Sequence, residues 1–213
     1  MTKKCRTVII IVAHPDDEIL WAGGTILSHT SWNCFVLCLC RGSDEDRAPR
    51  FRNVLNIIKV KGVMGDLDDE PEQNPLNEAE VENAILKLLP TTHFDLIITH
   101  SAKGEYTRHL RHEETNKAVI KLWHTGKLQA HELWTFAYED GHKSYFPMPI
   151  HHASIFTRLT EKIWLRKYYI ITEIYGFAKE SWEARTTPKA EAFWKFENAL
   201  NAYKSLPKKG SQE

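Results

Sequence analysis

The stretch that decides the fold is VIIIVAHPDDE, residues 8–18. Its first half, Val8 to Val12, is an uninterrupted β-branched run, typical of a central parallel strand that is buried on both faces. Its second half is polar and contains Pro15, a residue that is well tolerated at the start of a helix. The stretch therefore predicts a buried strand that leads at once into a helix, with acidic residues at the junction.

The same alternation of strand and helix continues along the chain. We predict helices over 17–28, 51–61, 77–89 and 109–123, and strands over 35–40, 94–99 and 133–138. The segments 41–49 and 65–75 are predicted as loops, the second acidic and solvated. Two further helices are expected over 154–169 and 188–203. This order predicts an α/β fold with a mostly parallel sheet and helices on both faces.

Composition narrows the class of protein. The 213 residues, 42% of them hydrophobic, predict a soluble single domain over 1–213 with a flexible tail at 207–213. Lys plus Arg and Asp plus Glu number 28 each, which argues against a nucleic-acid partner. No apolar window reaches the ~18 residues of a membrane span. The apolar start leads into the polar motif without a cleavage site, so a cytoplasmic location is expected.

Three of the four cysteines, Cys34, Cys38 and Cys40, fall within one apolar run. Their even spacing predicts that they share one face of the second strand. Neighbours on one strand cannot surround an ion tetrahedrally without help from elsewhere. We therefore expect buried thiols that act as small hydrophobic side chains.

Two polar clusters follow predicted strands, where parallel sheets bind their ligands. In the first, Asp16 and Asp17 begin a helix and point about 100° apart, so one can bind an ion while the other addresses a water. In the second, His109 and His112 lie three residues apart on one side of a helix. Two histidines and one carboxylate with an open position form a hydrolytic zinc set. Zinc lowers the pKa of a bound water to about 7.

These motifs resemble a known family. The segments AHPDDE (13–18), GGT (23–25) and HLRH (109–112) look like the N-acetylglucosaminyl-phosphatidylinositol de-N-acetylase family, also called PIG-L or LmbE-like. The resemblance covers roughly residues 7–125, with a weak echo at 188–194. It implies a Rossmann-like fold and a zinc-dependent hydrolase. The implied substrate is a small N-acetyl sugar or glycoconjugate, from which an acetyl group is removed at an N-acetylglucosamine-type amide.

The resemblance also implies a role for each motif residue. It makes His14, Asp17 and His112 the metal ligands and Asp16 the general base. It makes His109 the group that stabilises the oxyanion or protonates the leaving amine.

Substrate contacts are implied less directly. The family often places an Arg twelve residues before a Gly in the helix after the second strand. Arg50 fits that spacing to Gly62, with Arg47 and Arg52 close by, and Asn53 stands where an acid often follows. Tyr106 precedes the histidine pair and either polarises the substrate carbonyl or packs.

Other interpretations stay open at this point. The same metal site could cleave another amide or a thiol-sugar conjugate, or could stabilise a binding module without turnover. A dinucleotide-binding protein is excluded because no Gly-rich loop follows the first strand. A homo-oligomer is compatible with the sequence. The remaining histidines at 100, 142, 151 and 152 are expected on the surface or in satisfied positions.

Overall fold

The structure, a computed structural model, describes residues 5–207. It contains a seven-stranded sheet with the strand order β3-β2-β1-β4-β5-β9-β8. The first five of these strands run parallel, whereas β9 and β8 join antiparallel. The strands of this sheet are β1 (Thr7–Val12), β2 (Asn33–Cys40), β3 (Lys61–Leu67), β4 (His93–Thr99), β5 (Gln129–Phe136), β8 (Ile155–Arg158) and β9 (Ala190–Phe196). A two-stranded sheet pairs β6 (Tyr138–Glu139) with β7 (Met148–Pro149).

The apolar run at the start of the chain forms the centre of the large sheet. β1 pairs with β2 on one side and with β4 on the other. Because successive side chains on a strand point to opposite faces, Val8, Ile10 and Val12 enter one hydrophobic core while Ile9 and Ile11 enter the other. Burial on both faces is why this strand has no polar alternation.

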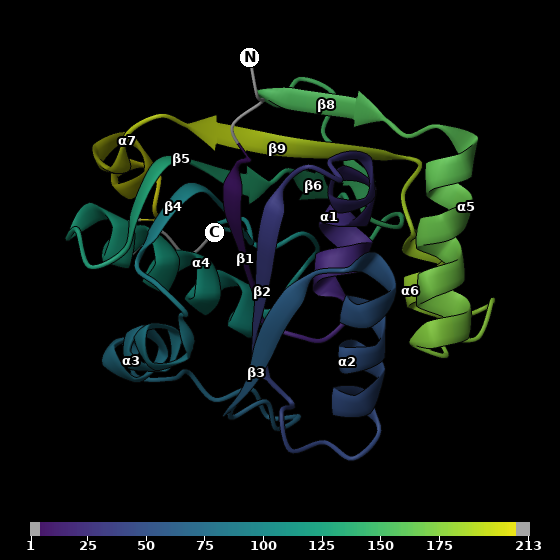
Figure 1. The fold of residues 1–213 in the computed structure, drawn as a ribbon, viewed down its shortest axis with the longest axis horizontal. Helices are drawn as coiled ribbons and strands as arrows, with labels where there is room; N and C mark the ends of the chain where they lie inside the picture. The colour runs from purple at the N-terminus through teal and green to yellow at the C-terminus, as the bar shows by residue number, and fades with distance from the viewer. Residues whose placement is uncertain (1–4, 208–213) are drawn as a thin grey trace.

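Helices cover both faces of the sheet, which confirms the predicted α/β class (Figure 1). One core receives side chains from α1 (Asp17–Ser28), α2 (Arg47–Ile58), α5 (Glu161–Tyr169) with its π-helical continuation η1 (Ile170–Ile174), and α6 (Trp182–Thr186). The other core receives side chains from α3 (Glu78–Leu88), α4 (Leu110–His124) and α7 (Ala199–Lys204). Two separate cores, one on each face, hold the sheet between the helical layers.

The second helix differs from the prediction at both ends. α2 begins at Arg47, inside the segment predicted as a loop, because Pro49 lies in the first helical turn and needs no backbone donor there. It ends at Ile58, and Lys59 caps it in a left-handed conformation with φ 58°. Gly62 therefore does not end the helix. It lies in β3, where an added Cβ would stand 2.5 Å from the Val36 carbonyl oxygen.

Three strands occupy segments that the sequence patterns assigned to other structure. β3 extends to Leu67 and takes the start of the predicted acidic loop. β8 lies in the predicted helix 154–169, and the helix α5 begins only at Glu161. β9 takes residues 190–196 of the predicted helix 188–203, and helix occurs there only in α7, from Ala199. Of the predicted tail at 207–213, residues 208–213 lie outside the described residues.

The three cysteines of β2 are buried as expected, but they do not share a face. Cys34 and Cys38 belong to the core that contains Val8, whereas Cys40 belongs to the core that contains Ile9. The pairing of β2 with β3 shifts register between Cys38 and Cys40. Such a bulge moves the later side chains to the opposite face.

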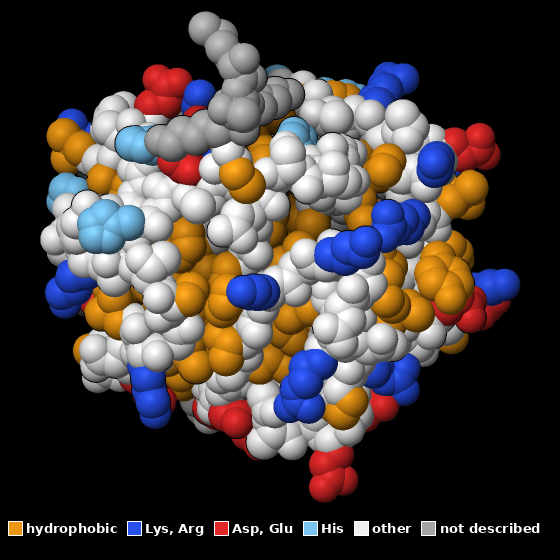
Figure 2. Space-filling model, in the orientation of Figure 1, with side chains coloured by type: hydrophobic (Ala, Val, Ile, Leu, Met, Phe, Trp, Pro, Cys, Tyr) orange, Lys and Arg blue, Asp and Glu red, His pale blue; other side chains and the backbone are white. Residues whose placement is uncertain are grey.

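β3 forms one edge of the sheet, and most of its side chains are half-buried. Figure 2 shows hydrophobic side chains gathered near the middle of the face seen in Figure 1, with Lys and Arg side chains among them. Val63 and Met64 of β3 pack against the two cores but remain partly exposed. The cores are therefore only partly covered at this edge by the chain that the structure describes.

The strand order places a functional site. From β1 the chain builds outward to β2 and β3 on one side and later returns to β4 and β5 on the other. The carboxyl ends of β1 and β4 therefore lie side by side at a topological switch point, where open α/β sheets bind ligands. Over the described residues, no helix has the length and apolar character needed to span a membrane.

Candidate active site

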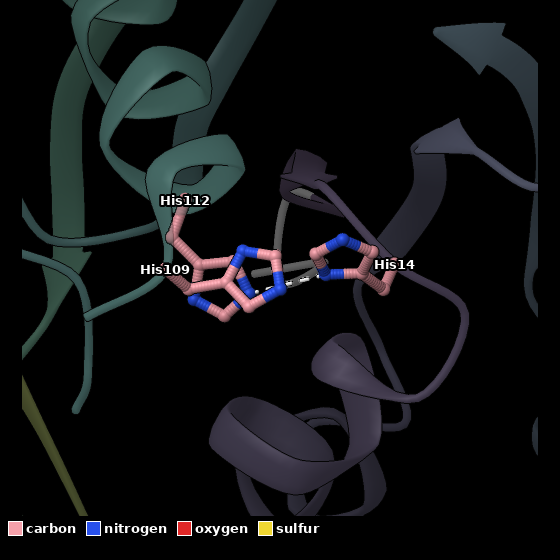
Figure 3. Close-up of side chains that lie close together, drawn as sticks. All are labelled: His14, His109 and His112. Atoms are coloured by element: carbon pink, nitrogen blue, oxygen red, sulfur yellow. Dashed lines mark hydrogen bonds between the residues drawn. The ribbon is translucent and has the colours of Figure 1, made fainter. Parts of the chain in front are cut away.

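Three side chains from two sequence motifs converge at the carboxyl ends of β1 and β4. His14 follows β1, Asp17 begins α1, and His112 lies in the first turn of α4. The His14 Nδ1 is 3.2 Å from the His112 Nε2. The Asp17 Oδ2 is 3.3 Å from that His14 nitrogen and 3.4 Å from that His112 nitrogen. Figure 3 shows the two imidazoles directed toward each other from separate elements, with His109 beside them.

Outer hydrogen bonds orient both imidazoles. The His112 Nδ1 lies 2.6 Å from Glu105 Oε2, and the His14 Nε2 lies 3.1 Å from Asp69 Oδ1. Because a carboxylate only accepts hydrogen bonds, these contacts assign the proton of each neutral ring to the nitrogen that faces away from the centre. The nitrogens that face each other then carry lone pairs and meet the acceptor oxygen of Asp17. This is the kind of group that a cation satisfies.

The separations of these three atoms fit a tetrahedral ion. With metal–ligand bonds of about 2.0–2.1 Å, tetrahedral geometry places two ligand atoms roughly 3.3 Å apart. The three observed separations lie between 3.2 and 3.4 Å. Two imidazole nitrogens and one carboxylate oxygen also form the donor set of catalytic zinc sites, which keep a fourth position open. The residues present therefore fit a divalent metal.

The pKa values of Asp17 and His112 reflect the close approach of these buried charged groups. Burial alone would raise the pKa of Asp17, but the charges of His112 and His100 outweigh it and hold that pKa well below its ordinary value. Burial and His100 lower the pKa of His112, yet Asp17 and Glu105 raise it above its ordinary value. Protons on the histidines thus compensate the carboxylates.

Asp16 lies just before α1 rather than in its first turn. It has φ 131° and ψ −29°, a backbone conformation that L-residues rarely adopt. Its backbone N–H donates to Glu18 Oε2 over 3.1 Å, and Glu18 in turn accepts from the Tyr175 hydroxyl. Burial, and then the charge of Asp17, raise the pKa of Asp16 well above its ordinary value. The strained backbone at Asp16 turns the carboxylates of Asp16 and Asp17 toward different surroundings.

His109 occupies the residue before α4 and faces the same centre. Its ring stacks on His112 with centroids 4.6 Å apart and stands edge-on to His14 at 4.5 Å. The amide of Gln73 lies 3.0 Å from His109 Nε2. Burial, together with the charges of His112 and His14, lowers the pKa of His109 to about 3.

These groups line a pocket of about 380 Å³. His14, Asp16, Asp17 and His109 lie on its surface, and His112 lies behind them, fully buried. Tyr106 also lines the pocket, with its ring centroid 5.4 Å from that of His112. Its hydroxyl makes no hydrogen bond within residues 5–207, so it is free to donate to a ligand.

The arginines near α2 occupy different places. Arg50 donates to Asp46 and to the Tyr175 carbonyl oxygen, and it does not line the pocket. Arg47 does line it, and its guanidinium lies 4.6 Å from the ring centroid of Phe177. Arg41 reaches the pocket through a hydrogen bond from its Nε to Asp69, 2.9 Å long.

Beyond β3 the segment 65–75 is a mostly exposed loop, as predicted, but it is also part of the site, which its acidic pattern did not indicate. The buried Arg111 donates to the carbonyl oxygens of Asp68 and Asn74, and so holds the segment against α4. This brings Asp69 to His14 and Gln73 to His109. The sequence holds one clue, since Arg111 stands between the two motif histidines where a surface residue is expected.

Glu105 and His100 were also missed as parts of the site. His100 is fully buried, and its Nδ1 lies 2.9 Å from the carboxylate of Glu105 that also orients His112. Its Nε2 accepts from the Ala13 N–H over 2.9 Å and lies 3.4 Å from Asp17. His100 is satisfied, as expected, but its partners belong to the candidate site: Glu105, Asp17 and the backbone of Ala13.

The fold and site define a class: α/β proteins with a cluster of His and Asp side chains, suited to a metal ion, at the switch point of the sheet. Residues 9–123, more than half of the chain, match the family described as PIG-L: GlcNAc-PI de-N-acetylase. The chain belongs to this family, as its motifs predicted.

Individual relatives are distant in sequence. "Uncharacterized protein L374" of Acanthamoeba polyphaga mimivirus is 22% identical over 179 residues, which cover 76% of each chain. The N,N'-diacetylchitobiose deacetylase from Pyrococcus horikoshii has 18% identity and a TM-score of 0.69, over 93% of this chain and 86% of that one. GalB, the 4-carboxy-2-hydroxymuconate hydratase from Pseudomonas putida KT2440, has 15% identity and a TM-score of 0.62, over 98% and 99%. At these identities the two solved structures show the shared fold.

Proposed function

We propose that the protein is a metal-dependent hydrolase that removes an acetyl group from an N-acetylglucosamine-type amide. One observation carries the proposal: three ligand atoms at tetrahedral separations face a pocket that also contains Asp16. Membership in the GlcNAc-PI de-N-acetylase family supports the choice of an acetyl amide. The Pyrococcus horikoshii relative is described as a diacetylchitobiose deacetylase, which supports a sugar substrate.

His14, Asp17 and His112 would hold the metal, with zinc as the first candidate for this donor set. When bound, such an ion supplies a Lewis acid that polarises an amide carbonyl and makes a water more acidic. Glu105 and Asp69 hold the two imidazoles in the tautomers that bind it. A metal site that only stabilised the fold would need these three ligands alone, and the carboxylate of Asp16 would then have no role.

The chain's own groups would carry the proton transfers. Asp16 lines the pocket next to the ligand Asp17 and serves as general base, taking the proton of the attacking water. His109 and the unpaired hydroxyl of Tyr106 are the donors that would stabilise charge on the amide oxygen. The leaving amine then receives a proton from Asp16 or His109.

Substrate contacts follow from the lining of the pocket. Arg50 remains a proposed contact, but it would have to leave Asp46 and Tyr175 to reach a ligand there. Arg47 already lines the pocket and makes no ion pair within the described residues. We therefore place Arg47 ahead of Arg50 as the group that binds the sugar hydroxyls.

Two other functions use the same site. The metal could serve cleavage of another amide or of a thiol-sugar conjugate, or it could only stabilise a binding module. The full-length match to a hydratase adds water addition as a third reaction, because a shared fold does not determine the chemistry.

Metal analysis combined with a substrate panel tests the proposal. We expect about one divalent transition metal per chain in protein purified without chelator. We also expect acetate release from N-acetylglucosamine glycosides that stops on chelation and returns with zinc. Metal-loaded protein that releases no acetate from any N-acetyl sugar would refute the deacetylase, and turnover of a hydroxymuconate would favour the hydratase. Size-exclusion chromatography decides whether the chain forms the homo-oligomer with which its sequence is compatible.

A further inference from the structure

The pocket has two unlike groups of lining residues. One group is charged and includes Arg41, Arg47 and Asp69. The other is aromatic and consists of Tyr106 and Trp182, whose ring centroids lie 4.8 Å apart. The reaction described above uses the charged group and Tyr106, but it gives no task to Trp182. A large aromatic side chain at the pocket surface needs a separate explanation.

Trp182 is held in place from several sides. It is the first residue of α6, and Ser181 caps that helix by accepting from the Ala184 N–H over 3.2 Å. The indole stands edge-on to Tyr106, and also to Trp21 at 6.3 Å. Trp21 donates to the metal-ligand candidate Asp17 over 2.9 Å. The position of the indole relative to the metal centre is therefore fixed by packed rings.

The indole nevertheless stays accessible. Trp182 is 37% exposed, although its ring contacts both Tyr106 and Trp21. Within residues 5–207 no ring stacks parallel to it, and its Nε1–H donates to no protein acceptor. Partly exposed aromatic rings in concave, mostly preformed sites are typical of surfaces that contact a ligand.

We propose that Trp182 is the platform on which the sugar ring of the substrate rests, so that it selects cyclic N-acetyl sugars over acyclic acetamides. This inference rests on the proposed function and specifies its substrate class. One face of a pyranose ring presents C–H groups, which suit an aromatic surface, while its hydroxyls suit Arg47 and the free indole N–H. The platform would place the amide toward Asp16 and His109.

The test compares turnover of two amides by the metal-loaded enzyme. The probes are methyl N-acetylglucosaminide, which is cyclic, and N-acetylethanolamine, which is not. Trp182→Ala should raise KM for the cyclic amide about tenfold with little change in kcat, because stacking acts in ground and transition states alike. KM for the acyclic amide should stay within twofold. Trp182→Phe keeps a ring and should recover most of the loss.

A second readout does not depend on turnover. Binding of free glucosamine, followed by saturation-transfer NMR, should weaken in Trp182→Ala and persist in Trp182→Phe. Tyr169→Ala is the matched control, because this tyrosine is 53% exposed on α5 and does not line the pocket. Metal content should be unchanged in all three variants.

The outcomes separate the two proposals. If the wild type cleaves the cyclic amide and Trp182→Ala has an unchanged KM, the platform is refuted and the deacetylase stands. If the wild type cleaves neither these two amides nor any other N-acetyl sugar of the panel, the deacetylase is refuted, and glucosamine binding then decides the platform by itself. Equal losses for the cyclic and acyclic amides would also refute it, since they would indicate general damage to the pocket.

Discussion

Two buried clusters of charged side chains contact α1 at different points along the helix, and their hydrogen bonding differs. At the amino end of the helix, the Asp17 carboxylate accepts from the His14 backbone N–H and the Trp21 indole, while one of its oxygens lies 3.3–3.4 Å from the facing ring nitrogens of His14 and His112. Farther along, Glu191 of β9 accepts from the Lys167 ammonium, from the backbone N–H groups of Gly24 and Thr25, and from the Thr25 hydroxyl, all over 2.6–2.7 Å.

The comparison shows how a structural cluster differs from a ligand site. The Glu191 cluster is complete, because four donors satisfy its two oxygens, and it joins α1, α5 and β9. Buried polar groups that are fully hydrogen-bonded stabilise a single arrangement. The cluster around Asp17 is incomplete because the facing ring nitrogens of His14 and His112, 3.2 Å apart, need a proton or a cation between them. Removing one side chain from each cluster should therefore give different defects.

The largest effect is expected from the adjacent acids of the incomplete cluster. Asp16→Asn should lower kcat by about 10²–10⁴-fold, because the amide cannot act as a general base, and it should keep its metal. Asp17→Asn should lose most of its metal, because an amide is a poorer ligand than a carboxylate. Metal analysis beside acetate release measures both changes.

The matched pair carries its own control, since the two substitutions change one charge each at neighbouring positions. Metal loss in Asp16→Asn with retention in Asp17→Asn would require the two roles to be exchanged. Loss in both would instead widen the ligand set to include Asp16.

The complete cluster should respond in stability rather than in metal content. Lys167→Met removes one partner of a buried ion pair and should lower the free energy of unfolding by about 3–5 kcal/mol. Urea denaturation measures it, with the exposed Lys162→Met on the same helix as control. The folded fraction should bind metal as the wild type does. If Lys167→Met remained stable but lost its metal, the Glu191 cluster would support metal binding and not only stability.

The same contrast explains what the sequence could predict. The Val8–Val12 run, the two acids and the histidine pair are local patterns, so the central strand and α1 could be predicted. The same patterns named the three side chains, His14, Asp17 and His112, that the structure brings together. β9 could not, because Ala, Glu and Lys favour helix in isolation, whereas its Glu191 is buried by a lysine 24 residues earlier. The segment around Asp69 was missed for a similar reason, since Arg111, 43 residues beyond Asp68, orders it.

Edge position accounts for another miss. β3 contains two glycines and one exposed acid, and it lies at the end of the sheet, so it lacks both the apolar run of a central strand and a clean alternation. Arg47 was placed in a loop because residues 41–49 are polar and rich in Asp and Ser, although proline at position 49 suits a first helical turn. The substrate-facing side of the pocket was therefore the least predictable part of the site.

A smaller effect, on metal affinity, is expected from Glu105, which contacts the outer nitrogen of His112. Glu105→Gln keeps the size of the side chain but removes the charge that orients His112 and His100. Outer partners of this kind typically change metal affinity by about 10–100-fold. Competition with a chelating dye measures the affinity, and Glu113→Gln, whose partner is the exposed Arg108, is the control. Equal affinities in the two variants would show that Glu105 only helps folding.

The smallest effect separates two arginines of one helix. Arg47 lines the pocket and lies over Phe177, whereas Arg50 is engaged by Asp46 and Tyr175. If Arg47 binds sugar hydroxyls, Arg47→Ala should raise KM for an N-acetyl sugar about tenfold and change kcat little, because such a contact acts equally in ground and transition states. Arg50→Ala should mainly lower stability, by about 1–2 kcal/mol, through the lost hydrogen bond to the Tyr175 carbonyl.

Steady-state kinetics of both variants give KM, and urea denaturation gives the free energy of unfolding. The reverse pattern, with KM raised only in Arg50→Ala, would mean that Arg50 leaves its partners when substrate binds. It would also restore the assignment that motif spacing favours.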